Sequence, residues 1–183
     1  MGLTSQQNTT LKAFILADPT MSVQPMNEDG GYAIAELLNK TATPDFQVWN
    51  SRASIDSIFD SVIWANMTPA APASADSTGI YRDRALTCQG KQFSLQTLLQ
   101  GRQTIDATKT NIRSGLQDAL TSLPSGTNGA NQGAGWIAVQ LVLQRTATVI
   151  EKLFATGTGS TASPALVVVT SISVRDVGYA RNS

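Results

Sequence analysis

Residues 54–63 read Ser-Ile-Asp-Ser-Ile-Phe-Asp-Ser-Val-Ile, and this stretch decides the fold class. Its apolar side chains recur at positions i, i+3, i+4, i+7 and i+8, which is the spacing of one face of an α-helix. Ser54 precedes the first apolar residue and is a preferred N-cap. The stretch therefore predicts an amphipathic helix that must bury its apolar face against other parts of the chain.

Segments on both sides of this helix repeat the same spacing. Further helices are predicted over about residues 5–17, 29–39, 81–100, 105–123 and 136–154. Asp29 is expected to cap the second of these segments, and Gly101 is expected to end the third in the left-handed conformation. The last segment is the most apolar, and it is expected to form one central buried helix.

A chain of 183 residues is long enough for one domain with a sizeable core. We expect a mainly α fold, in which a single helical domain over residues 1–183 forms a bundle of about five or six helices. Flexible loops are expected near residues 68–79, which are rich in Pro, Ala and Ser, and near residues 125–135, which are rich in Gly and small polar residues. Residues 160–183 are expected to form a short extended or β C-terminal arm.

Within the arm, the β-branched residues Val167–Val169, Ile172 and Val174 predict a strand. One strand cannot form a sheet alone, so it pairs either with the short alternating segment Phe46–Trp49 or with a neighbouring subunit by strand addition. The second possibility makes the run and the glycine-rich loop a candidate interface of Val167, Val168, Val169, Ile172, Val174, Gly126, Gly129 and Gly133. The alternative for the valines is an internal strand, because folds usually cover an unpaired apolar edge. Ser173 and Asp176 have the spacing of a capping pair for a last helical turn.

The chain carries 13 basic and 13 acidic residues, so its net charge is zero and no overall field attracts nucleic acid or a membrane. Residues 1–76 have three basic and eight acidic side chains, and residues 77–183 have ten basic and five acidic ones. Oppositely charged faces on one subunit would favour head-to-tail contact between identical copies, which closes into rings. The alternative is that the two halves interleave in the fold and the asymmetry disappears.

The residue types that most enzymes need are missing. There is no histidine, which removes the usual general base, the Ser-His-Asp and Cys-His nucleophile systems and the commonest metal ligand. Cys88 is the single cysteine, so a zinc site is not expected, and this residue is interpreted as a small buried hydrophobe. Asp56 and Asp60 stand one helical turn apart, but on the polar side of the helix, where a solvated face is the better interpretation. We therefore expect no catalytic residue, no metal, no cofactor and no enzymatic activity.

Motifs for binding phosphate or a membrane are weak. The Gly-x-Gly motifs at Gly133 and Gly157 lack the Lys-Ser/Thr of a P-loop and follow no buried strand. Arg82, Arg84 and Lys91 lack interleaved aromatic residues, which favours a solvated helix surface over a nucleic-acid interface. No stretch approaches the roughly 20 apolar residues that a bilayer requires, and the N-terminal residues are polar, so we expect neither an ordinary signal peptide nor a membrane span. A lone thiol suits a reducing compartment such as the bacterial cytoplasm.

Several blocks of the sequence carry a resemblance to a known family. They are Gln24-Pro-Met-Asn-x-Asp-Gly30, Ala35-x-Leu-Leu-Asn39, Phe46-x-Val-Trp49, Arg145-x-Ala-Thr-x-x-Glu-Lys-Leu-Phe-Ala-Thr-Gly-Thr-Gly159 and Ser163-Pro164. The similarity spans about Leu11–Tyr179, and the block from Arg145 to Gly159 is the most specific. The chain resembles a family encoded in the virion-assembly gene clusters of tailed bacteriophages and prophages.

The resemblance implies a structural virion protein that is present in the host bacterial cytoplasm during assembly. Within that setting, a small helical protein with a protruding loop and an extended arm is similar to head-to-tail connector proteins, also called adaptor or neck proteins. The expected partners are further copies in a ring, the portal, and tail or neck proteins, with packaged DNA close by but not bound specifically. Alternatives are a capsid decoration or minor head protein and a tail completion protein. The missing histidine and the neutral charge make an accessory enzyme or DNA-binding factor a weaker alternative.

Overall fold

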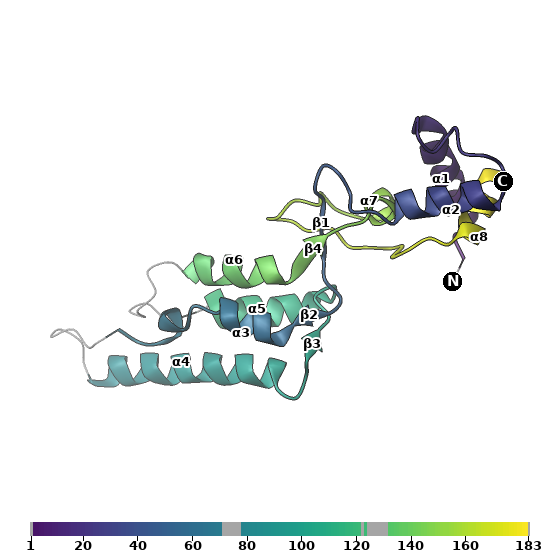
Figure 1. Cartoon of the computed structure of the whole chain (residues 1–183). Helices are drawn as coiled ribbons and strands as arrows, with labels where there is room; N and C mark the ends of the chain where they lie inside the picture. The colour runs from purple at the N-terminus through teal and green to yellow at the C-terminus, as the bar shows by residue number, and fades with distance from the viewer. Residues whose placement is uncertain (1, 71–77, 122, 124–131, 183) are drawn as a thin grey trace. The chain divides into compact units, whose positions relative to one another are not determined.

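The computed structural model describes residues 2–70, 78–121, 123 and 132–182, and it is mainly helical, as the apolar spacing predicts (Figure 1). The chain divides into two compact units. Met1–Val48 and Thr146–Ser183 form unit 1, and Trp49–Arg145 form unit 2. This differs from the single domain expected over residues 1–183, because the middle of the chain closes a core of its own.

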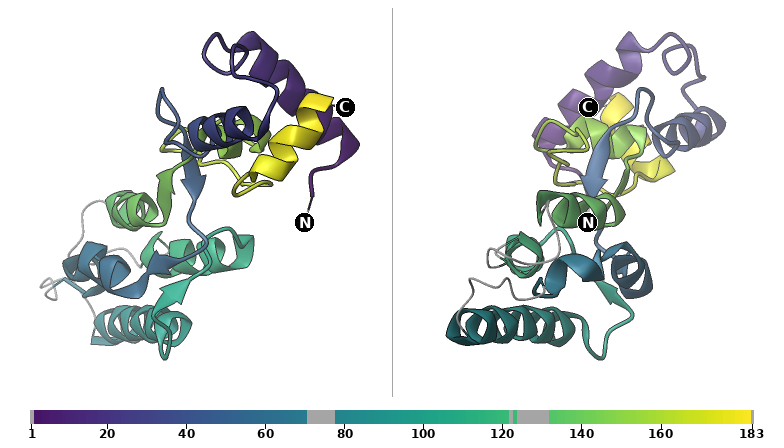
Figure 2. Two further views of the ribbon diagram at one scale, coloured as in Figure 1. Left: turned by 45° about the vertical axis from the view of Figure 1, so that its right-hand side comes forward. Right: turned by 90° about the vertical axis from the view of Figure 1, so that its left-hand side faces the viewer.

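Unit 1 brings both ends of the chain together (Figure 2). Its helices are α1 (Ser5–Ala17), α2 (Glu28–Leu38), α7 (Val149–Phe154) and α8 (Val174–Asn182). Thr4 caps α1 through a capping box, in which its side chain accepts a hydrogen bond from the Gln7 backbone N–H and the Gln7 side chain accepts one from the Thr4 N–H. The predicted first helix, residues 5–17, is thereby confirmed.

Helix α2 begins earlier than expected. The cap is Asn27, whose side chain accepts a hydrogen bond from the Gly30 N–H at 3.0 Å. The predicted cap, Asp29, is wrong, and this residue lies in the first turn, where a carboxylate complements the positive end of the helix dipole. Helix α8 packs against both α1 and α2. The core of unit 1 includes Leu11, Ile15, Ile34, Leu38, Ile150, Ile172, Val177 and Ala180.

A small β-structure lies next to this helical core. Strand β1 (Gln47–Trp49) pairs with strand β4 (Gln144–Thr146), and Val48 also forms a parallel bridge with Ala165. The expected extended segment at Phe46–Trp49 is thereby confirmed over most of its length. Gly159 has a φ of +67° and lies against the ring of Phe46, so that a Cβ at this position would collide with the ring. The glycine therefore lets the chain pass close to the aromatic side chain.

Unit 2 is built from α3 (Ile55–Ser61), the 3-10 helix η1 (Trp64–Met67), α4 (Thr78–Leu99), α5 (Thr110–Thr121) and α6 (Gln132–Val142). Ser54 caps α3 as predicted, with its hydroxyl accepting from the Ser57 N–H. Strands β2 (Ala53–Ser54) and β3 (Thr104–Ile105) pair antiparallel. Helix α5 packs against both α4 and α6, which lie on its two outer sides (Figure 1). The core includes Ile55, Ile58, Leu95, Leu99, Leu116, Leu120, Val139 and Leu143.

The expected single helix over residues 136–154 is wrong. Helix α6 ends at Val142, β4 follows, and α7 begins at Val149. The backbone of Ala147 is used elsewhere, because its carbonyl accepts from the Ala42 N–H at 2.9 Å and its N–H donates to the Phe46 carbonyl at 2.8 Å. These long-range bonds compete with a continuous helical ladder. The apolar residues on either side of the break belong to different cores.

A second capping box starts α7 after this break. The Thr148 side chain accepts from the Glu151 N–H, and the Glu151 carboxylate accepts from the Thr148 N–H at 2.9 Å. Glu151 is buried, with 2% of its surface exposed. Alanine at this position would leave the part-buried Thr148 N–H without its acceptor.

We expect Glu151→Ala to lower the free energy of unfolding of unit 1 by about 2 kcal/mol, because the part-buried Thr148 N–H then loses its acceptor. The measurement is urea denaturation followed by far-ultraviolet circular dichroism. Glu151→Gln is the matched control, since its amide oxygen can still accept the Thr148 N–H, and it should retain most of the stability. Equal losses in the two variants would contradict this role of the carboxylate.

Several other helix and loop boundaries differ from those predicted from the sequence. Helix α5 starts at Thr110, because Ile105 belongs to β3. Gly101 has a φ of +74° directly after α4, as predicted for the residue that ends this helix. The expected loop at 68–79 falls largely on residues 71–77, which lie outside the described residues, and its last two residues begin α4. The expected loop at 125–135 overlaps α6 from Gln132 onward, and its earlier part lies outside the described residues.

Candidate partner-binding surfaces

A loop of unit 1, residues 167–171, bends at Val168 and makes no backbone hydrogen bond within the described residues. Before it, Leu166 and Thr156 exchange two backbone hydrogen bonds of 2.9 Å each. After it, the Asn39 side chain accepts from the Ile172 N–H at 3.2 Å and donates to the Ile172 carbonyl at 2.9 Å. Within the described residues, no backbone N–H or carbonyl of residues 167–171 has a hydrogen-bond partner. The segment is therefore anchored at both ends and open between them.

The side chains of this segment alternate in burial. Val167 and Val169 are half-buried against the cores of unit 1, whereas 58% of Val168 is exposed. Thr170 and Ser171 are also exposed. Because the chain bends at Val168, this alternation belongs to a surface loop and not to a straight strand.

The predicted C-terminal strand and arm are partly wrong. Among the described residues near it, only Ala165 and Leu166 form β-bridges, and Val174 is the first residue of α8. Ile172 is buried, and Val174 packs against the same core, so the internal alternative describes these two residues. Residues 160–183 are therefore no free arm, because α8 returns to the helical core.

The glycine candidates have a different outcome. Gly133 is exposed in α6, so this part of the expected loop is helical. Gly126 and Gly129 lie outside the described residues.

Asn39 was missed as a functional candidate, although it ends one of the blocks that carry the family resemblance. Its only sequence signal was its place at a helix end.

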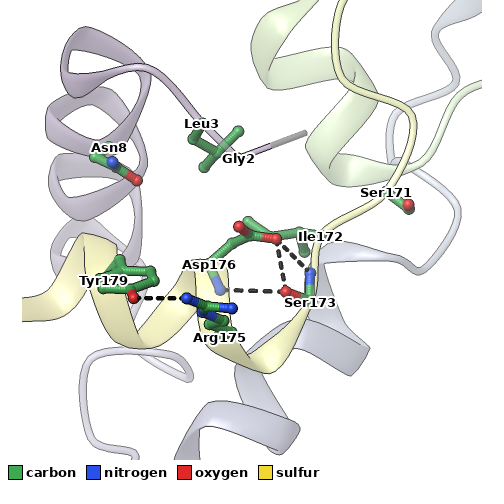
Figure 3. Close-up of a pocket in the computed structure, with 9 residues that line it drawn as sticks. All are labelled: Gly2, Leu3, Asn8, Ser171, Ile172, Ser173, Arg175, Asp176 and Tyr179. Carbon is green, nitrogen blue, oxygen red and sulfur yellow. Dashed lines mark hydrogen bonds between the residues drawn. The ribbon is translucent and has the colours of Figure 1, made fainter.

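A groove of about 750 Å³ lies at the end of the open segment (Figure 3). It is lined by Gly2, Leu3, Asn8, Ser171, Ile172, Ser173, Arg175, Asp176 and Tyr179. A neighbouring groove of about 450 Å³ is lined by the N-terminal residues 2–4, Gln7, Asp176 and residues 168–171. The two grooves share Gly2, Leu3, Ser171 and Asp176, so together they follow the open segment along much of its length.

The charged side chains of the grooves are already engaged (Figure 3). The Ser173 hydroxyl and N–H both donate to the Asp176 carboxylate, at 2.7 and 3.1 Å, and the Asp176 N–H donates back to the hydroxyl. This confirms the predicted capping pair. Arg175 donates to the Tyr179 hydroxyl at 3.0 Å, and this hydrogen bond raises the pKa of the guanidinium above its usual value. These hydrogen bonds all lie within residues 173–179, so the side chains of Asp176 and Arg175 are held by neighbours at the start of α8.

One polar atom in the larger groove has no partner. The Asn8 side-chain carbonyl oxygen is buried and accepts no hydrogen bond within the described residues. A buried acceptor of this kind is usually satisfied, because leaving it without a partner costs free energy.

Unit 2 presents apolar side chains on two helices. On α4, Leu86 and Phe93 stand two turns apart with 58% and 70% of their surface exposed, whereas Cys88 and Leu95 are buried. On α6, Ile137 and Leu141 are 57% and 52% exposed, one turn apart. The apolar spacing predicted helices over residues 81–100 and 136–154 without separating inner from outer positions. Only the packing of each helix made that distinction.

The polar candidates of unit 2 have structural or solvated roles. Lys91 bridges α4 to α5 through an ion pair of 2.6 Å with Asp118. Arg82 lies 3.6 Å from Asp83 on the same helix. Asp56 and Asp60 are exposed on α3, as the solvated interpretation predicts. Cys88 is buried, and its burial raises the pKa of the thiol, as expected for a small hydrophobe rather than a nucleophile.

The charge asymmetry of the sequence halves largely disappears in the fold. Unit 1 carries five basic and seven acidic residues, and unit 2 carries eight basic and six acidic ones, so their net charges are −2 and +2. The sequence halves had net charges of −5 and +5. The reduction arises mainly because residues 49–76, with one basic and three acidic side chains, belong to unit 2, and partly because residues 146–183, with three basic and two acidic ones, belong to unit 1.

Among the described residues, no cluster of three or more His, Cys, Asp or Glu side chains could hold a metal ion. None of their helices combines the length and the apolar character that crossing a membrane requires. Comparisons with protein-family models, with curated proteins and with solved structures find no match to this chain.

Proposed function

We propose that this chain is a structural subunit of a tailed-phage virion, and that it forms a ring as a head-to-tail connector between portal and tail. The observation that carries the ring is the pair of exposed apolar faces on unit 2, Leu86 with Phe93 on α4 and Ile137 with Leu141 on α6. The virion setting rests on the sequence blocks around Asn39 and Arg145–Gly159. The proposed contact joins the α4 face of one copy to the α6 face of the next.

The placement of the two faces supports a repeating contact. Helix α5 packs against both α4 and α6, so the two faces belong to helices on different sides of α5. A contact between two different patches is heterologous, and it closes into a ring when the rotation per copy permits. An isologous dimer would instead use one patch on both copies.

The chemistry of the faces supports the same contact. Residues 132–142, which form α6, include no charged side chain. Burying apolar side chains against such a helix therefore leaves no charge on α6 without a partner. Large exposed apolar residues that lie together on a helix are typical of interaction surfaces.

The position in the particle distinguishes the connector from the alternatives. Quantitative mass spectrometry and cryo-electron microscopy of purified particles would give the copy number and the location. We expect one ring of copies at the portal vertex. Copies spread over the shell would make the chain a decoration or minor head protein, and a position at the distal side of the tail would exclude the connector role.

Two double variants test the contact itself. Leu86→Lys with Phe93→Lys changes the α4 face, and Ile137→Lys with Leu141→Lys changes the α6 face. We expect each variant alone to be monomeric by native mass spectrometry, because every heterologous contact needs both faces. An equal mixture is expected to form two-chain particles, since the intact α6 face of the first variant still fits the intact α4 face of the second.

Thr87→Lys is the matched control for added charge, because Thr87 is exposed on α4 outside the apolar face. It should assemble like the unmodified chain, and circular dichroism should confirm helical content in all variants. Two outcomes would count against the heterologous contact. One is a double variant that still forms rings, and the other is a double variant that dimerises without its counterpart.

A further inference from the structure

We propose that a groove beside α1 receives Tyr32 of α2 from the neighbouring copy, so that unit 1 adds a second contact to the ring. This inference rests on the proposed ring. It concerns other surfaces, however, because the groove and α2 belong to unit 1, whereas the helix faces described above belong to unit 2.

The groove is apolar with basic side chains around it. It has a volume of about 150 Å³, and its lining includes the apolar side chains of Ile15, Leu16, Met21 and Met26 and the basic side chains of Lys12 and Arg181. Leu16 and Met26 are 64% and 70% exposed, and no acidic residue of the described chain lines the groove. Large apolar side chains that lie together on a surface are typical of interaction sites, and flexible methionines adapt to a partner.

The loop that forms one side of the groove is held in place by hydrogen bonds within the copy. Arg181 of α8 donates to the carbonyls of residues 24–25 at 2.7 and 2.8 Å. The Asp18 carboxylate accepts from the N–H groups of residues 20–21 at 2.8 and 2.9 Å. Docking of a partner therefore costs little further conformational entropy in this loop. Both acceptors of Arg181 are uncharged, and it forms no ion pair among the described residues.

The outward face of α2 has the complementary chemistry. Asp29, Tyr32 and Glu36 stand at positions i, i+3 and i+7, which lie on one face of a helix, and all three are exposed. Tyr32 is 59% exposed, although burial of an aromatic ring is favourable. Glu36 forms an exposed ion pair of 3.1 Å with Lys40, and pairs of this kind add so little stability that Glu36 can exchange its partner at small cost. The face thus presents an aromatic ring between two carboxylates.

The size and the charge of the groove match this face. An apolar protein cavity of about 150 Å³ accepts a benzene molecule, so a groove of this volume has room for one aromatic ring. The carboxylates beside Tyr32 are opposite in charge to Lys12 and Arg181, which gives the contact its orientation. Tyrosine is also among the residues that most often anchor an interface. A second copy of the chain therefore supplies an occupant of matching size and charge.

The two surfaces lie on different helices of the unit. Helices α1 and α2 each pack against α8, so both surfaces are held by one common neighbour. Because Tyr32 is exposed, it does not fill the groove of its own copy. A contact between two different patches repeats from copy to copy, as the proposed ring requires.

Zero-length crosslinking tests the docking directly. A carbodiimide joins a lysine amine to a carboxylate without a spacer, so it links only groups that touch. Rings are assembled from equal amounts of isotope-labelled and unlabelled chain, treated, digested and examined by mass spectrometry. We expect Lys12 to be linked to Asp29 or Glu36 in peptide pairs that join a labelled to an unlabelled copy. Such mixed pairs report contact between copies and exclude links within one copy.

Substitutions on both surfaces test the anchor and the charges. Tyr32→Ala removes the ring and should raise the protein concentration at which half of the chains are assembled at least about tenfold. Glu36→Lys should also raise it, and Lys12→Glu in the same chain should restore part of the loss, because opposite charges meet again.

Asp45→Lys is the matched control, since it reverses an exposed acidic charge of unit 1 outside both surfaces. It should assemble like the unmodified chain. Circular dichroism should report normal helical content in every variant, so that a change in assembly reports the contact and not the fold.

The outcomes separate the two proposals. Rings that yield no mixed link from Lys12 to the α2 carboxylates, or that form equally well with Tyr32→Ala, would overturn the docking and leave the connector ring standing. Two-chain particles that carry the mixed links would support the docking and overturn the ring. A chain that remains monomeric at every concentration and salt would overturn both.

Discussion

Alanine at position 30 is expected to destabilise unit 1 by about 3 kcal/mol or more, since the added methyl group has no room and the backbone must move. Gly30 is buried in the first turn of α2. A Cβ at this position would collide with the carbonyl group of Pro25, a backbone group that no side-chain rotation can displace. Moving α2 away from this carbonyl would also disturb the cap that Asn27 forms with the Gly30 N–H.

Gly178→Ala is the matched control for this substitution. Gly178 lies in α8 of the same unit, and a Cβ there meets nothing within 4 Å. Alanine should stabilise this helix by about 0.5 to 1 kcal/mol, because it loses less backbone entropy on folding than glycine does. Chemical denaturation followed by circular dichroism would give both values, and hydrogen exchange of α2 would localise the first. A Gly30→Ala variant as stable as the unmodified chain would contradict the collision.

Replacing Leu116 with alanine is expected to lower the free energy of unfolding of unit 2 by about 3 to 4 kcal/mol. Leu116 is fully buried in α5, the helix that packs against both α4 and α6. Removal of its side chain leaves a cavity among residues from three helices, and the loss includes both the transfer of the missing carbons and the cavity itself.

Tryptophan fluorescence is a selective measurement for this variant, because Trp49, Trp64 and Trp136 all belong to unit 2. Leu86→Ala is the control, since it removes the same atoms from an exposed position on the neighbouring helix. We expect the control to change stability by less than about 0.5 kcal/mol. Similar losses in the two variants would contradict the assignment of inner and outer leucines.

The helix faces of unit 2 would set the contact angle between copies in the proposed ring.

Helices with a regular apolar spacing and a local cap were predicted well. Residues 5–17 match α1, Ser54 caps α3, and Gly101 follows α4 in the left-handed conformation. These features depend on side chains within a few residues of one another, so periodicity and capping preferences are sufficient to find them. The solvated interpretation of Asp56 and Asp60 is confirmed for the same reason.

Features that depend on distant parts of the chain were predicted poorly. The apolar run at 136–154 gave no sign that Ala147 bonds with residues 42 and 46. The valines at 167–169 have strand propensity, yet no ladder forms there among the described residues, because a strand also requires a neighbour. The role of Asn39 requires residue 172 to lie beside it, and sequence spacing alone does not indicate that contact.

The sequence by itself determined that this protein is mainly helical, where its best amphipathic helices begin and end, and that it lacks the histidine on which much catalytic chemistry depends. Only the tertiary structure decided that the chain closes two cores, that both ends share one of them, and which apolar side chains remain outside. The reason is physical. Local propensities act over one or two helical turns, whereas a core and an anchored loop arise from contacts between residues more than a hundred positions apart, such as residues 39 and 172.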